Sequence, residues 1–451
     1  MLKQAFDRQE VQRYVSAVRD QLGSPELRGS VTQTADALGV PGDPVTQLQA
    51  TLPDIDQGVV SSGGQPADVP FLSRNPVHSL VQSTVEEKLR EQGTQDDTPV
   101  HRDLRERIIH TLESLLHPVR FGPEDRHWVS VIAGATLDRL ARGNHPFNPT
   151  PAEYQVSDDA RIVIVGDWGT GLPRARLVAE YMAQEVNAAL AAGRQAHVVH
   201  LGDVYYSGLE DEVRRNVLAP GLWPVTAEQA QRGVTSWSLN GNHDMYGGGF
   251  GYFETLLGDP RFATQRSPDG RATSFFRISS PSWDFVGLDT SWDTDVFSQG
   301  QAGVLADPQA QVVRAWAAES SRKLCLLSHH QLVSAYSTRD VGPVLGAKLK
   351  PLLDAQRLTA WIWGHEHRCM GFVPIPGVPH ARCIGHGGVP VQMTHTTPVP
   401  APGAWEERAC FAQNGDPWAR FGFAILDLEG DRIGVRYRND TGATTRQEQI
   451  A

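Results

Sequence analysis

Five short segments of the chain carry side chains that could bind metal ions. They offer carboxylates, an amide, phenols and imidazoles, which together suit borderline or hard ions such as iron, manganese or zinc. Glycine stands beside most of these side chains and lets the backbone turn sharply and approach a metal ion or a phosphate. In chain order the segments are Gly166–Gly169, Gly202–Tyr206, Gly241–Asp244, Leu327–His330 and Gly364–His367.

Each segment has an ordinary interpretation when it is taken alone. Gly-Asp after a strand is usually a turn or a helix cap. Asn242 alone is typical of a turn, and the pair His365 and His367 alone is more often incidental. The joint occurrence of the five segments, in this order and mostly after apolar runs, favours one shared site.

The order of the segments resembles that of the calcineurin-like metallophosphoesterases, which are marked by Asp, Gly-Asp, Gly-Asn-His, a single His and Gly-His-x-His. Two details resemble the purple acid phosphatase branch of that family. The first segment contains Gly-Asp-x-Gly, and Tyr206 follows Asp203 at the third position. The resemblance covers residues 160–440 or so and does not extend to the N-terminal third of the chain.

The resemblance implies two metal ions, Fe(III) with a second ion of Fe, Zn or Mn. The side chains that it implies for the first ion are Asp167, Tyr206 and His367. Those that it implies for the second ion are Asn242, His329 and His365. Asp203 would bridge both ions. His243 would lie near the substrate, and Asp244 would orient its ring.

Such a site fits the chemistry of phosphate ester hydrolysis. Two metal ions about 3.5–4 Å apart can generate hydroxide near neutral pH, hold the phosphoryl oxygens and stabilise in-line displacement. His243 could assist the leaving oxygen, and general acid help of this kind is typically worth about 100- to 10,000-fold. The ordinary alternative for His243 and Asp244 is a hydrogen-bonded pair in a turn.

Four further positions near the segments have roles that the sequence leaves open or assigns to structure. His330 either lines the pocket or has no role, because the family varies there. Arg368 either meets a substrate anion or is solvated. Asp289 is expected to be structural, and His386 is expected to lie in a turn near the site without binding a metal.

Regular elements must bring the segments together. A helix is predicted at Arg174–Ala192, and a hairpin closes the chain. Alternating strands and helices predict an α/β fold, and the resemblance implies a four-layer metallophosphoesterase β-sandwich flanked by helices. Apolar runs predict strands at Ile162–Val165, His197–Leu201, Leu358–Trp363, Phe421–Leu428 and Ile433–Tyr437.

The chain is predicted to have two parts. Residues 1–155 form an N-terminal helical region with a Gly/Pro-rich loop at 24–75, and residues 156–451 form the catalytic domain. We expect the N-terminal helices to pack on the catalytic domain as a lid or buttress, and binding of a protein partner is the alternative. Helical spacing predicts helices at 11–22, from Pro76 onward, at 104–116 and at 123–142.

Composition excludes several classes of protein. The formal charge of −11 argues against a broad nucleic-acid surface, but a small phosphorylated substrate fits, because metal ions invert the local charge. Four cysteines without a C-x-x-C spacing indicate neither a zinc ribbon nor a disulfide frame. The chain has no apolar run long enough for a membrane span, and its first residues are charged, so a cytoplasmic protein is expected.

The sequence therefore predicts a metal-dependent hydrolase of phosphate esters, in the first place a phosphomonoesterase of the acid phosphatase type. A phosphodiesterase acting on nucleotides or small diesters is the second hypothesis, since sequence does not reveal the shape of the pocket. A third hypothesis belongs to another class: a metal-stabilised scaffold whose helical arm binds a partner.

Overall fold

The computed structural model describes residues 76–92, 142–294, 303–336, 342–393, 398–413 and 416–450, with a few isolated positions before them. The chain divides into two compact units. Unit 1 contains Met1–Gly143, Tyr246–Gly248 and Asp295–Gly300, and unit 2 contains the remainder. Unit 2 starts before the predicted residue 156, because strand β1 (Ala152–Gln155) pairs with a strand of the same unit.

Unit 1 holds one helix with described bounds, α5 (Pro76–Gln92), which confirms the helix predicted from Pro76 onward. Proline suits the first helical position, because its missing N–H has no partner there in any helix. The helices predicted at 11–22, 104–116 and 123–142 and the loop at 24–75 lie largely or wholly outside the described residues.

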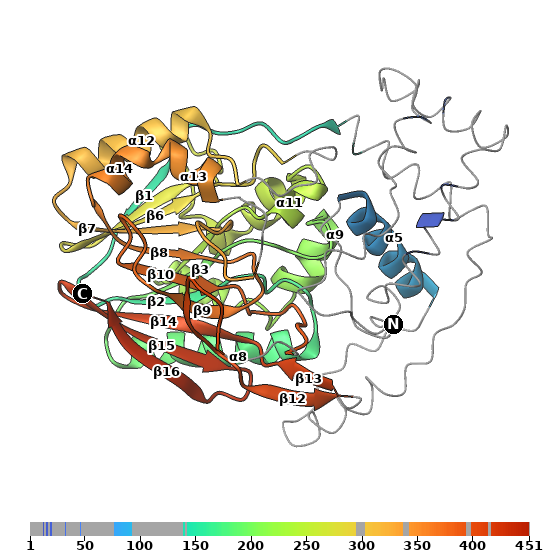
Figure 1. Ribbon diagram of the computed structural model, residues 1–451. Helices are drawn as coiled ribbons and strands as arrows, with labels where there is room; N and C mark the ends of the chain where they lie inside the picture. The colour runs from blue at the N-terminus through green and yellow to red at the C-terminus, as the bar shows by residue number, and fades with distance from the viewer. Residues whose placement is uncertain are drawn as a thin grey trace. The chain divides into compact units, whose positions relative to one another are not determined.

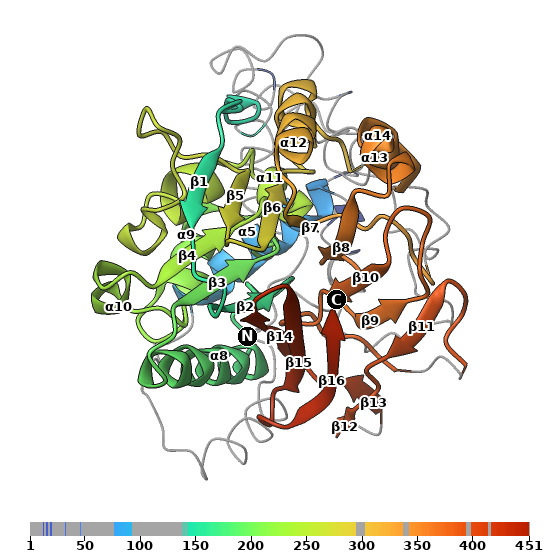
Figure 2. The same ribbon diagram turned by 90° about the vertical axis from the view of Figure 1, so that its left-hand side faces the viewer.

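The first sheet of unit 2 has six strands within the described residues, in the order β16-β15-β14-β2-β3-β4 (Figure 1, with β4 labelled in Figure 2). Strands β2, β3 and β4 run parallel, and β14, β15 and β16 continue the sheet in antiparallel fashion. The bounds are β2 Arg161–Val165, β3 Ala196–His200, β4 Thr235–Ser238, β14 Gly422–Glu429, β15 Arg432–Asn439 and β16 Thr444–Ile450.

The second sheet has eight strands in the described part of the chain, in the order β1-β5-β6-β7-β8-β10-β9-β11. Strands β6, β7, β8 and β10 run parallel. The bounds are β5 Phe276–Ser279, β6 Trp283–Leu288, β7 Lys323–Ser328, β8 Leu358–Trp363, β9 Cys369–Phe372, β10 His380–Ile384 and β11 Gly403–Glu406. A separate hairpin pairs β12 (Cys410–Gln413) with β13 (Asp416–Ala419).

Alternating side chains of the strands build two different cores. In β2, Ile162 and Ile164 pack between the two sheets, whereas Val163 and Val165 pack on the outer face beneath a helix. This follows from the two-residue period of a strand, and each fully buried side chain of this kind contributes about 1.5–3 kcal/mol. A parallel strand with both faces covered is therefore apolar throughout, as the run Ile162–Val165 is.

Helices cover the outer faces of both sheets (Figure 2). Helix α8 (Pro173–Ala191) packs Val178, Met182 and Val186 against the six-stranded sheet. Helix α12 (Asp307–Glu319) packs on the eight-stranded sheet. The layers are thus helix, sheet, sheet, helix, which confirms the predicted α/β fold with flanking helices.

Short helical segments connect the strands. The α-helical ones are α9 Glu210–Val213, α10 Ala227–Gln231, α11 Asn242–Tyr246, α13 Gly342–Lys348 and α14 Lys350–Asp354. Two π-helical turns, η1 (Arg214–Leu218) and η2 (Gly251–Leu256), and one 3-10 turn, η3 (Pro260–Phe262), complete the set within the described residues. None of the described helices is both long and apolar enough to cross a bilayer.

The predicted elements of unit 2 are confirmed to within a residue or two at most of their ends. Strands β2, β3 and β8 and helix α8 lie where apolar spacing placed them. The closing hairpin is the antiparallel pair of β14 and β15, in which Glu429 faces Arg432. Gly430 has φ 67° in its turn, a conformation that glycine adopts without steric cost.

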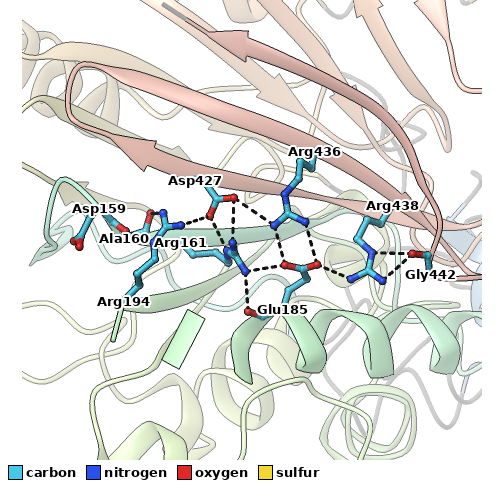
Figure 3. A network of polar contacts seen from close by, with 9 residues as sticks. All are labelled: Asp159, Ala160, Arg161, Glu185, Arg194, Asp427, Arg436, Arg438 and Gly442. Carbon is cyan, nitrogen blue, oxygen red and sulfur yellow. Dashed lines mark hydrogen bonds and ion pairs between the residues drawn. The ribbon is translucent and has the colours of Figure 1, made fainter. Parts of the chain in front are cut away.

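A network of arginines and carboxylates joins α8 to the six-stranded sheet (Figure 3). Glu185 of α8 accepts hydrogen bonds from Arg161 on β2 at 2.8 Å and from Arg436 on β15 at 2.9 Å. Asp427 on β14 accepts from Arg161 at 2.6 Å. The network as a whole contains Arg161, Glu185, Arg194, Asp427, Arg436 and Arg438.

Candidate metal centre

The five segments follow the carboxyl ends of parallel strands in the two sheets. Asp167 follows β2, Asp203 follows β3, and Asn242 follows β4 and begins α11. His329 directly follows β7, and His365 follows β8. Loops at the carboxyl ends of parallel strands lie at one edge of a sheet, so the strand order brings distant segments together.

A first group of candidate ligands forms around the carboxylates of Asp167 and Asp203. Ligand atoms of these two residues and of His367 all lie within 4.8 Å of one another. His367 Nε2 is 3.5 Å from Asp167 Oδ1. The hydroxyl of Tyr205 lies among them, 3.0 Å from Asp167 Oδ1, 3.0 Å from Asp203 Oδ2 and 3.1 Å from His367 Nε2.

The sequence predicted the phenol of Tyr206 as a ligand, and that role stays a prediction beside the observed contacts of Tyr205. Tyr206 takes part through its backbone: its amide donates to Glu212 at 2.8 Å, and its carbonyl oxygen lies 2.5 Å from His243 Nδ1. The structure therefore brings the side chain of Tyr205 to the carboxylates of the first group.

Backbone contacts hold the segment that carries Asp203 and Tyr205. Val204 forms a parallel β-bridge with Gly169, and the amide of Tyr205 donates to the carbonyl of Gly169 at 2.9 Å. Asp203 itself has a left-handed backbone, with φ 75°. In this tight turn the Tyr205 hydroxyl lies 3.0 Å from Asp203 Oδ2.

A second group forms around His329. Its Nε2 is 2.9 Å from Asn242 Oδ1 and 3.0 Å from His365 Nδ1. Ring nitrogens of His329, His330 and His365 lie within 4.8 Å of one another. The same Nε2 is 3.4 Å from Asp203 Oδ2, so Asp203 contacts both groups.

A carbonyl oxygen sets the tautomer of His329. Its Nδ1 lies 2.9 Å from the backbone oxygen of Leu201, which can only accept a hydrogen bond. Nδ1 must then carry the proton, and Nε2 presents a lone pair toward Asn242 and His365. This is the usual arrangement of a histidine that binds a metal ion.

Candidate ligands occupy left-handed backbone conformations. Among the described residues other than glycine, five have positive φ, and four of these five are candidate ligands. Such conformations cost about 1–3 kcal/mol each and persist where the surrounding structure imposes them, often at functional sites. The four are Asp167 (φ 55°), Asp203 (φ 75°), His365 (φ 66°) and His367 (φ 55°).

Close packing around Asp203 also explains the glycine of the third segment. A Cβ at Gly241 would lie 2.1 Å from Asp203 Oδ1, so no side chain fits there. The same oxygen accepts a hydrogen bond from the amide of His243 at 2.9 Å. Gly241 and His243 thus hold the third segment directly against the central carboxylate.

His243 and Asp244 have partners other than each other. The His243 ring lies 4.5 Å from the Tyr205 ring, centroid to centroid, with Nδ1 at the carbonyl of Tyr206. The Asp244 carboxylate accepts from the backbone amides of Gly241, Asp203 and Val204 at 2.8–3.2 Å. Asp244 therefore joins the second segment to the third, in place of its expected role of orienting His243.

Burial and nearby charge dominate the electrostatics of these groups. Burial, and then the charge of Asp203, raise the pKa of Asp244 to about 8. Burial, followed by the charges of Asp167 and Asp203, raises the pKa of the Tyr205 phenol well above its ordinary value. A cation bound among these groups would act in the opposite direction and favour the charged forms.

Three further positions have structural surroundings. Arg368 is buried, pairs with Glu406 at 2.6 Å and stacks on Tyr336, so it is not a solvated side chain. Asp289 accepts from the amides of Ser291 and Trp292 in a turn, as expected. His386 is buried next to the first segment, and burial lowers its pKa to about 3.

The donors of the two groups fit a pair of cations. Each group combines buried oxygen and imidazole nitrogen atoms, a mixture that iron, zinc and manganese accept. The side chains that could hold a first ion are Asp167, Asp203, Tyr205 and His367. Those that could hold a second ion are Asp203, Asn242, His329 and His365.

Among solved structures, the chain is similar to GAP50, the anchor in the inner membrane complex of Plasmodium, at 13% identity over 64% of this chain and 88% of that one, with a TM-score of 0.44. A 5'-nucleotidase from Candida albicans is 12% identical over 64% and 54%, with a TM-score of 0.35. A cold-active protein-tyrosine phosphatase from a psychrophilic Shewanella is 12% identical over 69% and 84%, with a TM-score of 0.30.

No curated protein matches the chain. Residues 160–369 match a family described as calcineurin-like phosphoesterase. The matched range contains all five segments of candidate ligands. This part of the chain is therefore a calcineurin-like metallophosphoesterase domain, as the order of the segments indicated.

Proposed function

We propose that this calcineurin-like metallophosphoesterase domain hydrolyses phosphomonoesters at a centre of two metal ions. The position of Asp203 carries the proposal. Its Oδ2 is 3.0 Å from the Tyr205 hydroxyl in the first group and 3.4 Å from His329 Nε2 in the second. A carboxylate shared in this way fits a bridge between two ions.

The phenol of Tyr205 supports a purple acid phosphatase-like centre, with Fe(III) in the first group and Fe, Zn or Mn in the second. Phenolate and carboxylate are hard ligands, whereas the second group is richer in imidazole. When bound, such a pair of ions supplies an activated water nucleophile and stabilises charge on the phosphoryl oxygens.

His243 is the proposed proton donor to the leaving oxygen. The carbonyl of Tyr206 can only accept, so the nearby Nδ1 of His243 carries a proton. Nε2 is then the atom at which a proton can be exchanged with the substrate. The amide of His243 donates to Asp203 and keeps the ring close to the two groups.

The substrate that we propose is a small phosphorylated molecule. The cytoplasmic location and the partner of the N-terminal helices remain predictions from the sequence. Hydrolysis of diesters is the second candidate, and the same measurement distinguishes it.

The test is phosphate release from a panel of monoesters and diesters by metal-loaded protein. Monoesters should be hydrolysed faster than diesters, and Asp203→Asn should lose nearly all activity together with metal. Asp211→Asn is the matched control, because its side chain is 71% exposed on α9. Preference for diesters would favour the second candidate. A protein that holds two metals without turnover, and unfolds on chelation, would be a scaffold.

A further inference from the structure

His330 lies beside the second group of candidate ligands, and the proposed function gives it no role. Its ring is fully buried. The ring centroid is 4.6 Å from that of His365 and 5.1 Å from that of His329. By position alone His330 could be a third imidazole ligand, because one of its ring nitrogens lies within 4.8 Å of ligand atoms of both neighbours.

Two hydroxyl groups from the end of strand β6 contact the ring on one side. Thr290 Oγ1 is 3.0 Å from His330 Nδ1, and it also accepts the backbone amide of His330 at 3.2 Å. Ser291 Oγ is 3.4 Å from the same Nδ1. Both hydroxyl-bearing residues are buried, at 0% and 1% exposure, so water does not replace these contacts.

The hydroxyl protons set the tautomer of His330. Within the described part of the chain, Nδ1 of His330 is the acceptor in reach of both hydroxyls. Its single lone pair accepts best from Thr290, the nearer hydroxyl, and a proton on Nδ1 would leave that buried hydroxyl proton without this acceptor, which is costly. Nδ1 therefore accepts, and the neutral ring carries its proton on Nε2.

His329 and His330 are thus neighbours with opposite tautomers. His329 donates from Nδ1 to the carbonyl of Leu201 and presents a lone pair at Nε2. His330 accepts at Nδ1 and presents an N–H at Nε2. A nitrogen that carries a proton cannot bind a cation, but it donates to an anionic oxygen.

We propose that His330 is a substrate-binding residue, which donates its Nε2–H to an oxygen of a phosphoryl group held at the second group of ligands. The inference rests on the proposed function, since it needs a phosphoryl group at this site. It separates the roles of two adjacent histidines: His329 binds the metal, and His330 binds the anion.

Two amide substitutions test the proposal, because each reproduces one ring nitrogen. The amide of His330→Asn stands near Nδ1 and keeps the contact with Thr290, but it lacks the distal donor. The amide of His330→Gln reaches the position of Nε2 and restores a donor there. The readouts are metal content and the affinity of the metal-loaded protein for inorganic phosphate, measured by calorimetry.

His330→Asn should retain both metal ions and bind phosphate about 10- to 100-fold more weakly, the usual effect of losing a hydrogen bond to a charged group. His330→Gln should stay within a few-fold of the wild type. Thr290→Val removes the hydroxyl that donates to Nδ1, so the proton of the His330 ring is no longer held on Nε2. This variant should bind phosphate more weakly and retain both metals. It provides the same test if His330→Asn does not fold.

Other results would overturn the proposal. Loss of one metal in His330→Asn would make His330 a ligand. Equal phosphate affinity in His330→Asn and the wild type would remove the donor role. If His330→Gln bound phosphate more weakly than His330→Asn, the loss of affinity would come from the lost contact with Thr290 and not from the lost donor at Nε2. A wild type that binds neither metal nor phosphate would end the proposed function itself, and this inference with it.

Discussion

Tyr205 and Asp203 show how one tight turn of backbone can supply two neighbouring groups to a site. Asp203 has a left-handed backbone, with φ 75°, and the parallel bridge between Val204 and Gly169 anchors the residues that follow it. The carboxylate of Asp203 and the phenol of Tyr205 lie 3.0 Å apart as a result. The neighbouring Tyr206 supplies its carbonyl to His243 instead.

Two conservative substitutions determine which of the two tyrosines binds Fe(III). In protein loaded with Fe(III), Tyr205→Phe should abolish the visible charge-transfer absorption of a tyrosinate, whereas Tyr206→Phe should leave it in place. The reason is that the Tyr205 hydroxyl contacts Asp167 and His367 in the first group of ligands. Absorption spectra with measured iron content provide the test, and the opposite pattern would return the role to Tyr206.

His243 should affect catalysis without affecting metal binding. His243→Ala removes the proposed proton donor, and kcat should fall by about 100- to 10,000-fold. Metal content should stay at the wild-type value, because the ring of His243 contacts Tyr205 and the carbonyl of Tyr206. If kcat of His243→Ala were unchanged at full metal content, His243 would not be the proton donor.

Residue types and their spacing predicted most of the candidate ligands. They did not predict the direction in which neighbouring side chains point. Sequence order identified Asp203, His329 and His365 as candidate ligands that the structure brings together. It predicted Tyr206 as the phenol and did not predict the contact of Tyr205 with the carboxylates, because the local backbone decides where a side chain points. It also did not assign Asp244 to the amides of neighbouring loops.

At the scale of elements, the ends of strands and the tight loops that follow them position the candidate ligands. Strands β2, β3 and β8 were predictable, because strands covered on both faces are continuous apolar runs. Which strands are neighbours was not predictable, since β14 pairs with β2 although the two strands lie far apart in the sequence. Pairings between such distant segments leave no periodic signal in the sequence.

The arginine network that joins α8 to the sheet predicts a sensitivity to acid. Burial alone would raise the pKa of Glu185, but hydrogen bonds and charge from Arg436 and Arg438, with the charge of Arg161, outweigh it and hold the pKa below 4.5. Burial is likewise outweighed at Asp427, whose pKa lies below 3.8. Both carboxylates therefore stabilise the fold above these unfolded values, and the contribution is lost as pH falls through the folded ones.

Glu185→Gln should lower the free energy of unfolding by about 1.5–3 kcal/mol at neutral pH, because charged hydrogen bonds to partly buried arginines are lost. The difference from the wild type should shrink as pH falls below 4.5, and it should vanish at the lower pH where the native carboxylate is itself protonated. Denaturant unfolding at several pH values measures this.

Glu429→Gln is the control for that series, since Glu429 is exposed at the end of β14. It should change the free energy of unfolding by no more than about 0.5 kcal/mol at any pH. A loss for Glu185→Gln that is equally small would mean that the network adds nothing to stability.

At the scale of the whole molecule, three apolar cores among the described residues of unit 2 support the site without including it. The core between the sheets and the cores under the helices are apolar, and the candidate ligands stand at strand ends outside them. The four-layer order follows from strands whose two faces are both buried. The fold of unit 2 should therefore not need metal ions.

Removal of metal should separate activity from folding. Chelation should abolish ester hydrolysis and lower the midpoint of thermal unfolding, because bound ions at about 1,000 times their Kd stabilise by about 4 kcal/mol. The far-UV circular dichroism should persist, and added metal should restore activity. Unfolding on chelation at room temperature would instead indicate a structural metal site.

The central claim is that Asp203 lies between two metal ions, and anomalous diffraction from metal-loaded crystals tests it most directly. We expect two peaks about 3.5–4 Å apart, with Asp203 bonded to both. One peak should lie among Asp167, Tyr205 and His367 and the other among Asn242, His329 and His365. A single peak, or two peaks without a shared contact to Asp203, would contradict the account.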